Sequence, residues 1–321
     1  MVRVRDTAWT PAARTFPDPD LPARAEQFAQ LLRGRRAVVL TGAGISTPSG
    51  IPDYRGPDSP GRTPMTYQQF VGDPAFRRHY WARNHLGWRH MESARPNAAH
   101  LRLAEWERRG LVTGVITQNV DLLHLKAGSR RLIDLHGTYA VVACLDCGAR
   151  QSRWALHEEL ERLNPGFAER VASRGAIEVA PDADAVLADT SQFRMVGCPA
   201  CAGVLKPDIV YFGENVPAAR VQAANELVDS SDLLVVVGSS LTVRSGYRFV
   251  RRAVTTGTPV VVVNRGRTRA HDEATLTIDG DCVDVLDLAD AALEGRTAPA
   301  GETPLEGQTA TRSSACTSGR P

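Results

Sequence analysis

The hydrophobic pattern of the chain alternates between short, continuous apolar runs and longer amphipathic segments. The apolar runs end at glycine or polar residues, which is typical of strands buried on both faces. We expect such strands at residues 37–40, 112–117, 132–135, 233–237 and 259–263. Amphipathic patterns predict helices at residues 21–33, 97–109, 217–230 and 247–256. Strands that alternate with helices in this way predict an α/β fold with a doubly wound parallel sheet.

Two stretches interrupt this alternation and predict a second, smaller domain. One is rich in aromatics, arginine and proline, and the other carries most of the cysteines. We assign residues 51–95 (a helical insertion) and 139–204 (a cysteine module) to this small domain. The large domain then consists of residues 21–50, 96–138 and 205–293. Residues 1–20 form an N-terminal extension, and residues 294–321, which hold few large apolar side chains, are expected to be a disordered tail.

The composition excludes some classes of protein. The chain has 321 residues, of which 43% are hydrophobic, so it can bury a sizeable core. The formal net charge is only +2, without a basic stripe interleaved with aromatics, which argues against nucleic acid as a partner. No apolar run approaches the ~20 residues needed to cross a bilayer. Residues 1–20 also lack the apolar core of a secretory signal, so we expect a cytoplasmic protein with no membrane partner.

Four of the six cysteines form two Cys-x-x-Cys pairs, which in a cytosolic chain indicate metal or redox chemistry. Cys144 pairs with Cys147 and Cys198 with Cys201, and 50 residues separate the two pairs (198 − 147 − 1). Two such pairs complete a tetrahedral zinc site with no open position, so the metal would be structural. Redox use of one pair, as in thioredoxin, is the alternative.

A glycine-rich turn follows the first predicted strand. Gly42, Ala43 and Gly44 stand where the backbone N–H groups of a Rossmann-like turn approach a pyrophosphate. The third glycine of the usual fingerprint is replaced by Thr47. Taken alone, the turn predicts either a phosphate-binding loop or an ordinary tight turn.

Polar residues follow the next two predicted strands. Gln118, Asn119 and Asp121 come after one strand, and His136 comes after the other. Ligands of open α/β sheets bind at the carboxyl ends of the strands, and a histidine there is suited to work as a general base. The structural alternatives are a helix cap for Asp121 and a packing role for His136.

In order and rough spacing, these segments resemble the motifs of the sirtuin family. The resemblance runs from about Glu26 to Asp290. The matching segments are Gly42-Ala43-Gly44-Ile45-Ser46, Gly50-Ile51-Pro52-Asp53-Tyr54-Arg55, Thr117-Gln118-Asn119-Val120-Asp121, His136-Gly137, the two cysteine pairs, Lys206-Pro207-Asp208-Ile209-Val210-Tyr211-Phe212-Gly213-Glu214, Gly238-Ser239-Ser240 and Val263-Asn264.

The resemblance implies a Rossmann-type large domain, a small domain with a structural zinc, and an NAD-dependent protein-lysine deacylase or deacetylase. NAD would be consumed: nicotinamide leaves, and the acyl group of an acyl-lysine protein or peptide passes to ADP-ribose. Mono-ADP-ribosyl transfer to protein, at the same NAD site, is the alternative. The oligomeric state is left open.

The resemblance also implies roles for individual residues. His136 would be the general base, and Asn119 and Asp121 would act in the pocket that receives nicotinamide. Val210, Phe212, Gly213 and Glu214 would pair with the substrate backbone as an added strand. The NAD site would be lined by Gly42, Ala43, Gly44, Ile51, Asp53, Tyr54, Arg55, Gln118, Gly238, Ser239, Ser240, Asn264 and Cys282.

Three features are most similar to the class II branch of sirtuins. They are the long gap between the cysteine pairs, which predicts an extra helical piece near residues 154–163, the sequence of residues 125–131, and Tyr54 in place of a common phenylalanine. Tyr80 and Arg83 have the spacing with which the acidic-acyl branch recognises a carboxylate. We therefore expect a preference for succinyl-like or glutaryl-like groups. A surface arginine beside a packed tyrosine is the alternative.

Overall fold

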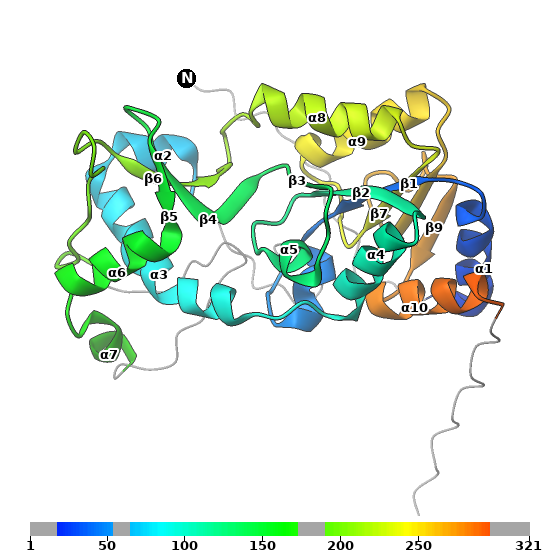
Figure 1. Ribbon diagram of the computed structural model, residues 1–321, viewed down its shortest axis with the longest axis horizontal. Coiled ribbons are helices and arrows are strands. Elements are labelled where there is room, and N and C mark those ends of the chain that lie inside the picture. Colours follow the sequence, from blue (N-terminus) through cyan, green and yellow to red (C-terminus); the bar gives the residue numbers. More distant parts are fainter. Residues whose placement is uncertain (1–17, 54–64, 173–189, 296–321) are drawn as a thin grey trace, which may run out of the picture.

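A six-stranded sheet, all of whose strand pairs are parallel, forms the centre of the computed structural model, which describes residues 18–53, 65–172 and 190–295 (Figure 1). The strand order is β3-β2-β1-β7-β8-β9. The strands are β1 (Ala37–Thr41), β2 (Val112–Thr117), β3 (Leu132–Asp134), β7 (Leu233–Val237), β8 (Val260–Asn264) and β9 (Leu276–Asp279). The doubly wound α/β class is confirmed, and each predicted strand is present; β9 was not predicted.

The strand order reverses direction between β1 and β7. From β1 the chain proceeds to β2 and β3 on one side, and from β7 to β8 and β9 on the other. This arrangement corresponds to the Rossmann order 3-2-1-4-5-6. A crevice opens at such a reversal, outside the carboxyl ends of the strands, and ligands of this fold class bind there.

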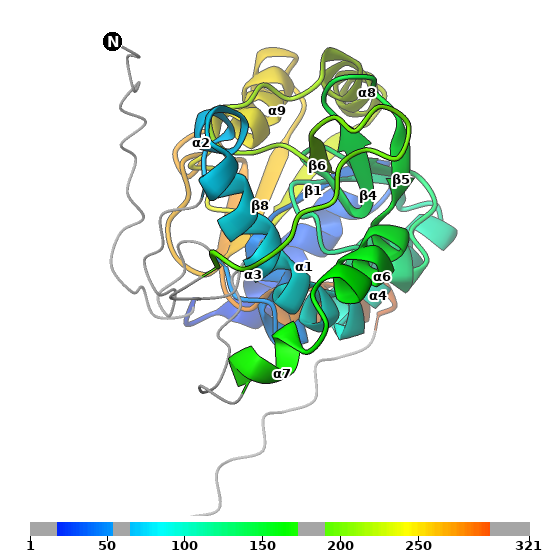
Figure 2. The ribbon, with the colours of Figure 1, turned by 90° about the vertical axis from the view of Figure 1, so that its left-hand side faces the viewer.

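Helices cover both faces of the sheet. On one face Phe28 and Trp106 pack edge to face with each other, within the cluster that holds apolar side chains of the strands. That face is covered by α1 (Leu21–Leu32), α4 (Ala98–Arg108) and α10 (Cys282–Leu293), and the other by α8 (Ala218–Asp229) and α9 (Arg244–Thr255) (Figures 1 and 2). The predicted helices are confirmed to within a few residues, whereas α10 was not predicted. No helix in the described ranges has both the length and the apolar character to cross a membrane.

A smaller unit at the left of Figure 1 has its own core. Its antiparallel sheet has the order β5-β4-β6. The strands are β4 (Gly137–Cys144), β5 (Arg150–Ser152) and β6 (Leu205–Ile209), and the helices are α2 (Tyr67–Gly72), α3 (Pro74–Ser93), α6 (Arg153–Leu163) and α7 (Phe167–Ala172). The extra helical piece expected near residues 154–163 is α6. The domain boundaries themselves stay a prediction, and most of the expected extension and tail (1–17 and 296–321) lies outside the described residues.

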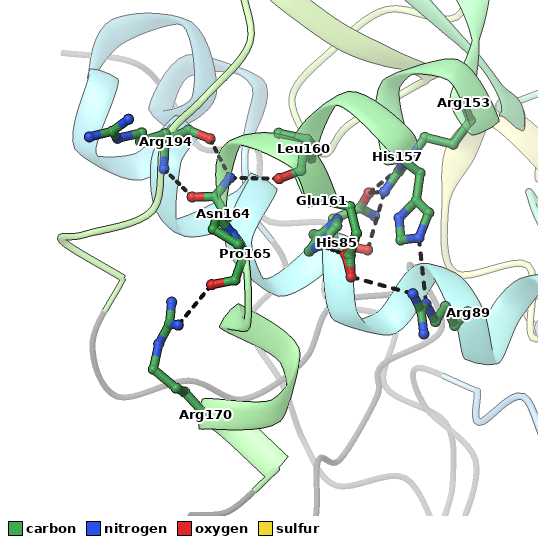
Figure 3. A network of polar contacts seen from close by, with 11 residues as sticks. His85, Arg89, Arg153, His157, Leu160, Glu161, Asn164, Pro165, Arg170 and Arg194 are labelled. Carbon is green, nitrogen blue, oxygen red and sulfur yellow. Dashed lines mark hydrogen bonds and ion pairs between the residues drawn. The ribbon is translucent and has the colours of Figure 1, made fainter.

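Helices α3 and α6 are joined by a buried arginine and a polar network (Figure 3). Arg153 is fully buried and donates to the Asn84 side-chain oxygen at 3.0 Å, with its guanidinium 4.9 Å from the centre of the Trp88 ring. Burial lowers the pKa of Arg153 to about 10, so it remains charged at neutral pH. On the outer side, Glu161 pairs with both His85 and Arg89. The inserted helix is thereby fixed to the rest of the small unit.

We expect Gly137→Ala to destabilise the protein far more than Gly257→Ala. Both glycines have a positive φ, which costs an alanine about 1 kcal/mol. At Gly137 the added Cβ would also lie 1.8 Å from the Asp208 carbonyl oxygen, whereas at Gly257 nothing lies within 4 Å. Chemical denaturation of the two variants should therefore differ by about 2 kcal/mol or more in unfolding free energy. Equal losses would contradict this view of the β4–β6 contact.

Candidate active site

Two glycine turns touch at the point where the strand order reverses. Gly44 N–H donates to the Gly238 carbonyl at 2.8 Å. A Cβ on Gly42 would lie 2.7 Å from the Cβ of Ser239, and a Cβ on Gly238 would lie 2.3 Å from the Ile45 nitrogen. There is no room for a side chain at Gly42 or at Gly238, so a glycine is required at both positions for the turns to touch. The turn after β1 continues as a 3₁₀ helix, η1 (Ala43–Ser49).

Side chains from the end of β2 tie these turns together. Gln118 Nε2 donates to Ser239 Oγ at 2.9 Å and to the Thr41 carbonyl at 3.2 Å. Asn119 Nδ2 donates to the Gly42 carbonyl at 3.1 Å and to Ser46 Oγ at 3.0 Å. The predicted residues Gly42, Gln118, Asn119 and Ser239 therefore converge on one edge of the sheet, as the position of their strands led us to expect.

Asp121 lies in the same cluster and is almost fully buried. Ser46 Oγ donates to its carboxylate at 2.7 Å, and the Leu123 N–H donates to its other oxygen at 3.0 Å. Burial raises the pKa of Asp121, while the hydrogen bonds from Leu123, Ser46 and Asn119 lower it. Leu123 is the first residue of α5 (Leu123–Ala127), whose N-cap is Leu122, so Asp121 binds the start of this helix without being its N-cap residue. The other oxygen faces Ser46, so Asp121 links the start of α5 to η1.

Two buried histidines support this cluster from behind. His124 Nε2 lies 2.9 Å from Thr41 Oγ1, His100 Nε2 lies 3.5 Å from Ser46 Oγ, and the two rings are 4.8 Å apart. Burial lowers the pKa of His100 to about 4 and that of His124 well below its usual value. Both rings are therefore neutral at physiological pH, and they support the site without adding charge.

His136 follows β3 and has a defined tautomer. Its Nδ1 lies 2.9 Å from the Gln118 carbonyl oxygen, which can only accept, so Nδ1 carries the proton. Nε2 therefore keeps its lone pair and accepts a hydrogen bond from Ser245 Oγ at 2.8 Å. Burial, with Arg220 and Arg248 nearby, lowers the pKa of His136 to about 4, although the Gln118 carbonyl opposes this. The neutral ring presents a basic nitrogen at pH 7.

Other predicted NAD-site residues are more dispersed. Asn264 ends β8 and binds the carbonyls of its own loop, at Arg265 and Gly266, and Ser240 lies 3.0 Å from the Thr242 hydroxyl. Cys282 begins α10 within the core of the large sheet. Ile51 is buried in the core of the small unit, and Asp53 directly precedes the gap at 54–64. The predicted residues Tyr54 and Arg55 lie outside the described part of the chain.

The predicted substrate segment runs from the end of β6 toward α2. Val210 N–H donates to the His136 carbonyl at 2.7 Å, which places this segment directly beside the histidine. The Phe212 carbonyl accepts from the Tyr67 N–H at 2.9 Å, and Gly213 has a positive φ. Glu214 forms an ion pair with the buried Lys206 at 3.0 Å. The segment is thus held at both ends while it borders the site.

Tyr80 and Arg83 take different environments on α3. Tyr80 packs in the aromatic core against Phe70 and Tyr211, with its hydroxyl 3.3 Å from that of Tyr139. Arg83 is half-buried, and its guanidinium lies 3.1 Å from the His79 ring nitrogen. The tyrosine is packed, as in the alternative considered above. Whether Arg83 binds a carboxylate stays a prediction.

The four paired cysteines meet at the end of the small sheet. Their sulfur atoms all lie within 4.8 Å of one another, with Cys144 Sγ to Cys201 Sγ at 3.6 Å and Cys147 Sγ to Cys198 Sγ at 3.7 Å. A disulfide would bring two sulfurs to ~2.05 Å, whereas four sulfurs around one zinc at ~2.3 Å are about 3.8 Å apart. The spacing and the all-thiol donor set therefore fit a structural zinc rather than a redox pair.

The sequence did not identify Ser46 or Ser245 as residues of the site. Ser46 was part of the recognised glycine motif, but nothing marked its hydroxyl as the link between Asn119 and Asp121. Ser245 lies 109 positions from its partner His136. A serine in the first turn of a helix is common, so only the folded structure reveals that contact.

Comparison with known proteins identifies the family of this chain. The model of the Sir2 family matches residues 42–245. An NAD-dependent protein deacetylase 1 from Mycobacterium avium (strain 104) is 62% identical over 266 residues, covering 83% of this chain and 94% of the relative. One from Streptomyces coelicolor is 51% identical, covering 84% and 89%. A solved structure of Sir2 with a p53 peptide and NAD+ superposes with a TM-score of 0.66 at 33% identity, covering 84% and 97%.

We expect the purified protein to contain about one zinc per chain, and Cys147→Ser to lose it. Three thiolates bind zinc far less tightly than four, and structural zinc contributes folding energy directly, so the variant should also melt at a lower temperature. Elemental analysis with a thermal melt measures both effects. Cys282→Ser, which changes a cysteine outside the cluster, is the control and should keep its zinc. Full zinc content in Cys147→Ser would refute the assignment.

Proposed function

The chain belongs to the Sir2 family and is an NAD-dependent protein deacetylase, and we propose that His136, Asn119 and Asp121 carry out its chemistry. The observation that carries this proposal is the convergence of the three side chains with two touching glycine turns at one edge of the sheet. NAD is the co-substrate: nicotinamide leaves, and the ribose accepts the acyl group.

The glycine turns are the part of the site suited to the pyrophosphate. Gly42 and Gly44 have no side chain and Ala43 has only a methyl group, so a phosphate can approach the backbone of this turn closely. Gln118 and Ser239 hold the facing turn in place through their mutual hydrogen bond. We assign the same NAD-binding role to Ser240, Asn264 and Cys282, which follow or border the neighbouring strands.

The buried cluster behind the turns is suited to nicotinamide. Asp121 and Asn119 are fixed through Ser46, whose carbonyl accepts from the Ile51 N–H at 3.3 Å, and we assign the Ile51 side chain to the apolar wall of the pocket. A buried carboxylate with its hydrogen bonds already arranged costs no reorganisation when a carboxamide binds or leaves. We propose that this preorganisation favours departure of nicotinamide from the ribose.

His136 is suited to remove a proton from a ribose hydroxyl. Its Nδ1–H is held by the Gln118 carbonyl, so the lone pair on Nε2 is aimed by the backbone. That lone pair accepts a hydrogen bond from Ser245 Oγ in the present structure, and a substrate hydroxyl would replace the serine as donor. Because the histidine is neutral at pH 7, it is ready to accept a proton without first losing one.

Acyl-lysine proteins or peptides are the proposed second substrate. Solved relatives of this fold are complexes of Sir2 with a p53 peptide and with an acetylated peptide. In this chain the Val210 N–H donates to the His136 carbonyl, and Phe212, Gly213 and Glu214 follow Val210, so a peptide bound along this segment would bring its lysine to the proposed base. We place the activity in the cytoplasm, since four clustered thiols suit a reducing compartment.

We also propose that the protein belongs to the class II branch and prefers acidic acyl groups. Support comes from helix α6, which occupies the long gap between the cysteine pairs, and from the half-buried Arg83. Since the Tyr80 hydroxyl already meets Tyr139, Arg83 is the group that we assign to the acyl carboxylate.

Purified protein with NAD and acyl-lysine peptides should release nicotinamide and deacylated peptide, and His136→Tyr should lose both by about a hundredfold or more, as removal of a general base does. Mass spectrometry of peptide and NAD products measures the reaction. A fold check on the variant excludes a collapsed site. ADP-ribose attached to protein, with no peptide deacylated, would instead make mono-ADP-ribosyl transfer the function.

We expect Arg83→Met to lower the ratio of desuccinylation to deacetylation by about tenfold or more, because a charged hydrogen bond is worth ~1.5–3 kcal/mol. The ratio is measured as kcat/KM for two peptides that differ only in the acyl group. Arg78→Met, which removes the same charge elsewhere on α3, is the matched control. An unchanged ratio in Arg83→Met would remove the acidic-acyl proposal and leave the deacetylase assignment intact.

A further inference from the structure

The first turn of α9 lies against the catalytic histidine. Ser245, the second residue of that helix, forms the hydrogen bond to His136 Nε2. Arg244 and Arg248 flank this serine, and both are exposed. Positions three and four apart share one face of a helix, so Arg248 lies on the side of both Arg244 and Ser245. The helix is at the top of Figure 1, beside α8.

These two arginines differ from the other arginines of the same helix. Arg252 forms an ion pair with Asp229 at 2.5 Å, and Arg251 with Glu273 at 3.7 Å. Among the residues that the structure describes, no carboxylate forms an ion pair with Arg244 or Arg248.

Asp208, which lies next to the residue after the histidine, already has cationic partners. Asp208 contacts Gly137 through its backbone, and its carboxylate is paired with Arg220 at 2.8 Å and with Arg150 at 2.7 Å. Asp208 is therefore neutralised locally and does not offset the two arginines on α9. Within the described part of the chain, Arg244 and Arg248 therefore remain without a carboxylate partner beside the histidine to which the acyl-lysine would be brought.

We propose that Arg244 and Arg248 form a specificity site that selects peptides with acidic side chains next to the acyl-lysine. The proposal rests on the deacetylase function given above, since it concerns which peptides that function accepts. The planar guanidinium donates two parallel hydrogen bonds to a carboxylate, which an ammonium group cannot do. Because both arginines are exposed, the contribution is modest and weakens with salt.

The test compares three acetyl-lysine peptides that are identical except for flanking glutamate, alanine or lysine. For the wild type, kcat/KM should fall in the order glutamate, alanine, lysine. In the double variant Arg244→Gln/Arg248→Gln, the glutamate-to-alanine ratio should fall about fivefold, as expected for two exposed ion pairs. Using a ratio removes any effect of these substitutions on His136 itself, since both peptides meet the same histidine.

Arg251→Gln is the matched control, because it removes one charge from the same helix about 10 Å from Arg244. It should keep the wild-type ratio. Raising the ionic strength should bring the wild-type ratio toward that of the double variant. An unchanged glutamate-to-alanine ratio in the double variant overturns the inference. A rise in KM for NAD that is equal for all three peptides also overturns it, because it would assign the arginines to the NAD phosphates. Failure of the wild type to deacetylate even the alanine peptide would instead refute the proposed function.

Discussion

The contact between two glycine turns is the constraint on which the site depends. Gly42 and Gly44 follow β1, Gly238 follows β7, and the backbones approach so closely that an added Cβ on any of the three would lie within 3.0 Å of the opposite turn. These strands are neighbours at the reversal of the strand order. The contact therefore joins the two halves of the sheet at this reversal, and it fixes the residues that we propose for NAD binding on one half relative to those on the other.

A polar network extends this constraint from the backbone to the side chains. Asn119 binds the carbonyl of Gly42 and the hydroxyl of Ser46, and Ser46 in turn binds Asp121. Burial acts in opposite ways on the two groups proposed for chemistry. It raises the pKa of the Asp121 carboxyl and lowers that of the His136 imidazole, so each is moved toward its neutral form. The hydrogen bonds from Ser46, Asn119 and Leu123 restrain the shift at Asp121.

The sequence predicts the central sheet well because its strands are continuous apolar runs. Strands β1 and β7 are buried throughout, so their composition alone identifies them. Strand β6 was not predicted, because Lys206, Pro207 and Asp208 conceal it, and β9 is only four residues long. The glycine motif and the cysteine pairs are local patterns and could be recognised. By contrast, the contacts of His136 with Ser245 and of Ser46 with Asp121 join distant positions, and no local pattern specifies them.

The strand β4 runs from the proposed catalytic histidine to the cysteine cluster. It begins at Gly137, directly after the histidine, and ends at Cys144, a cysteine of the metal cluster. Its partner β6 returns from the second cysteine pair and leads into Val210, whose N–H binds the His136 carbonyl. Strand β4 spans about 25 Å, and β6 pairs with both of its ends, at Gly137–Ile209 and at Cys144–Leu205, across an irregularity in register between them. Because Gly137 and Cys144 are the two ends of one strand, a single continuous segment of backbone joins the cysteine cluster to the residue that follows His136.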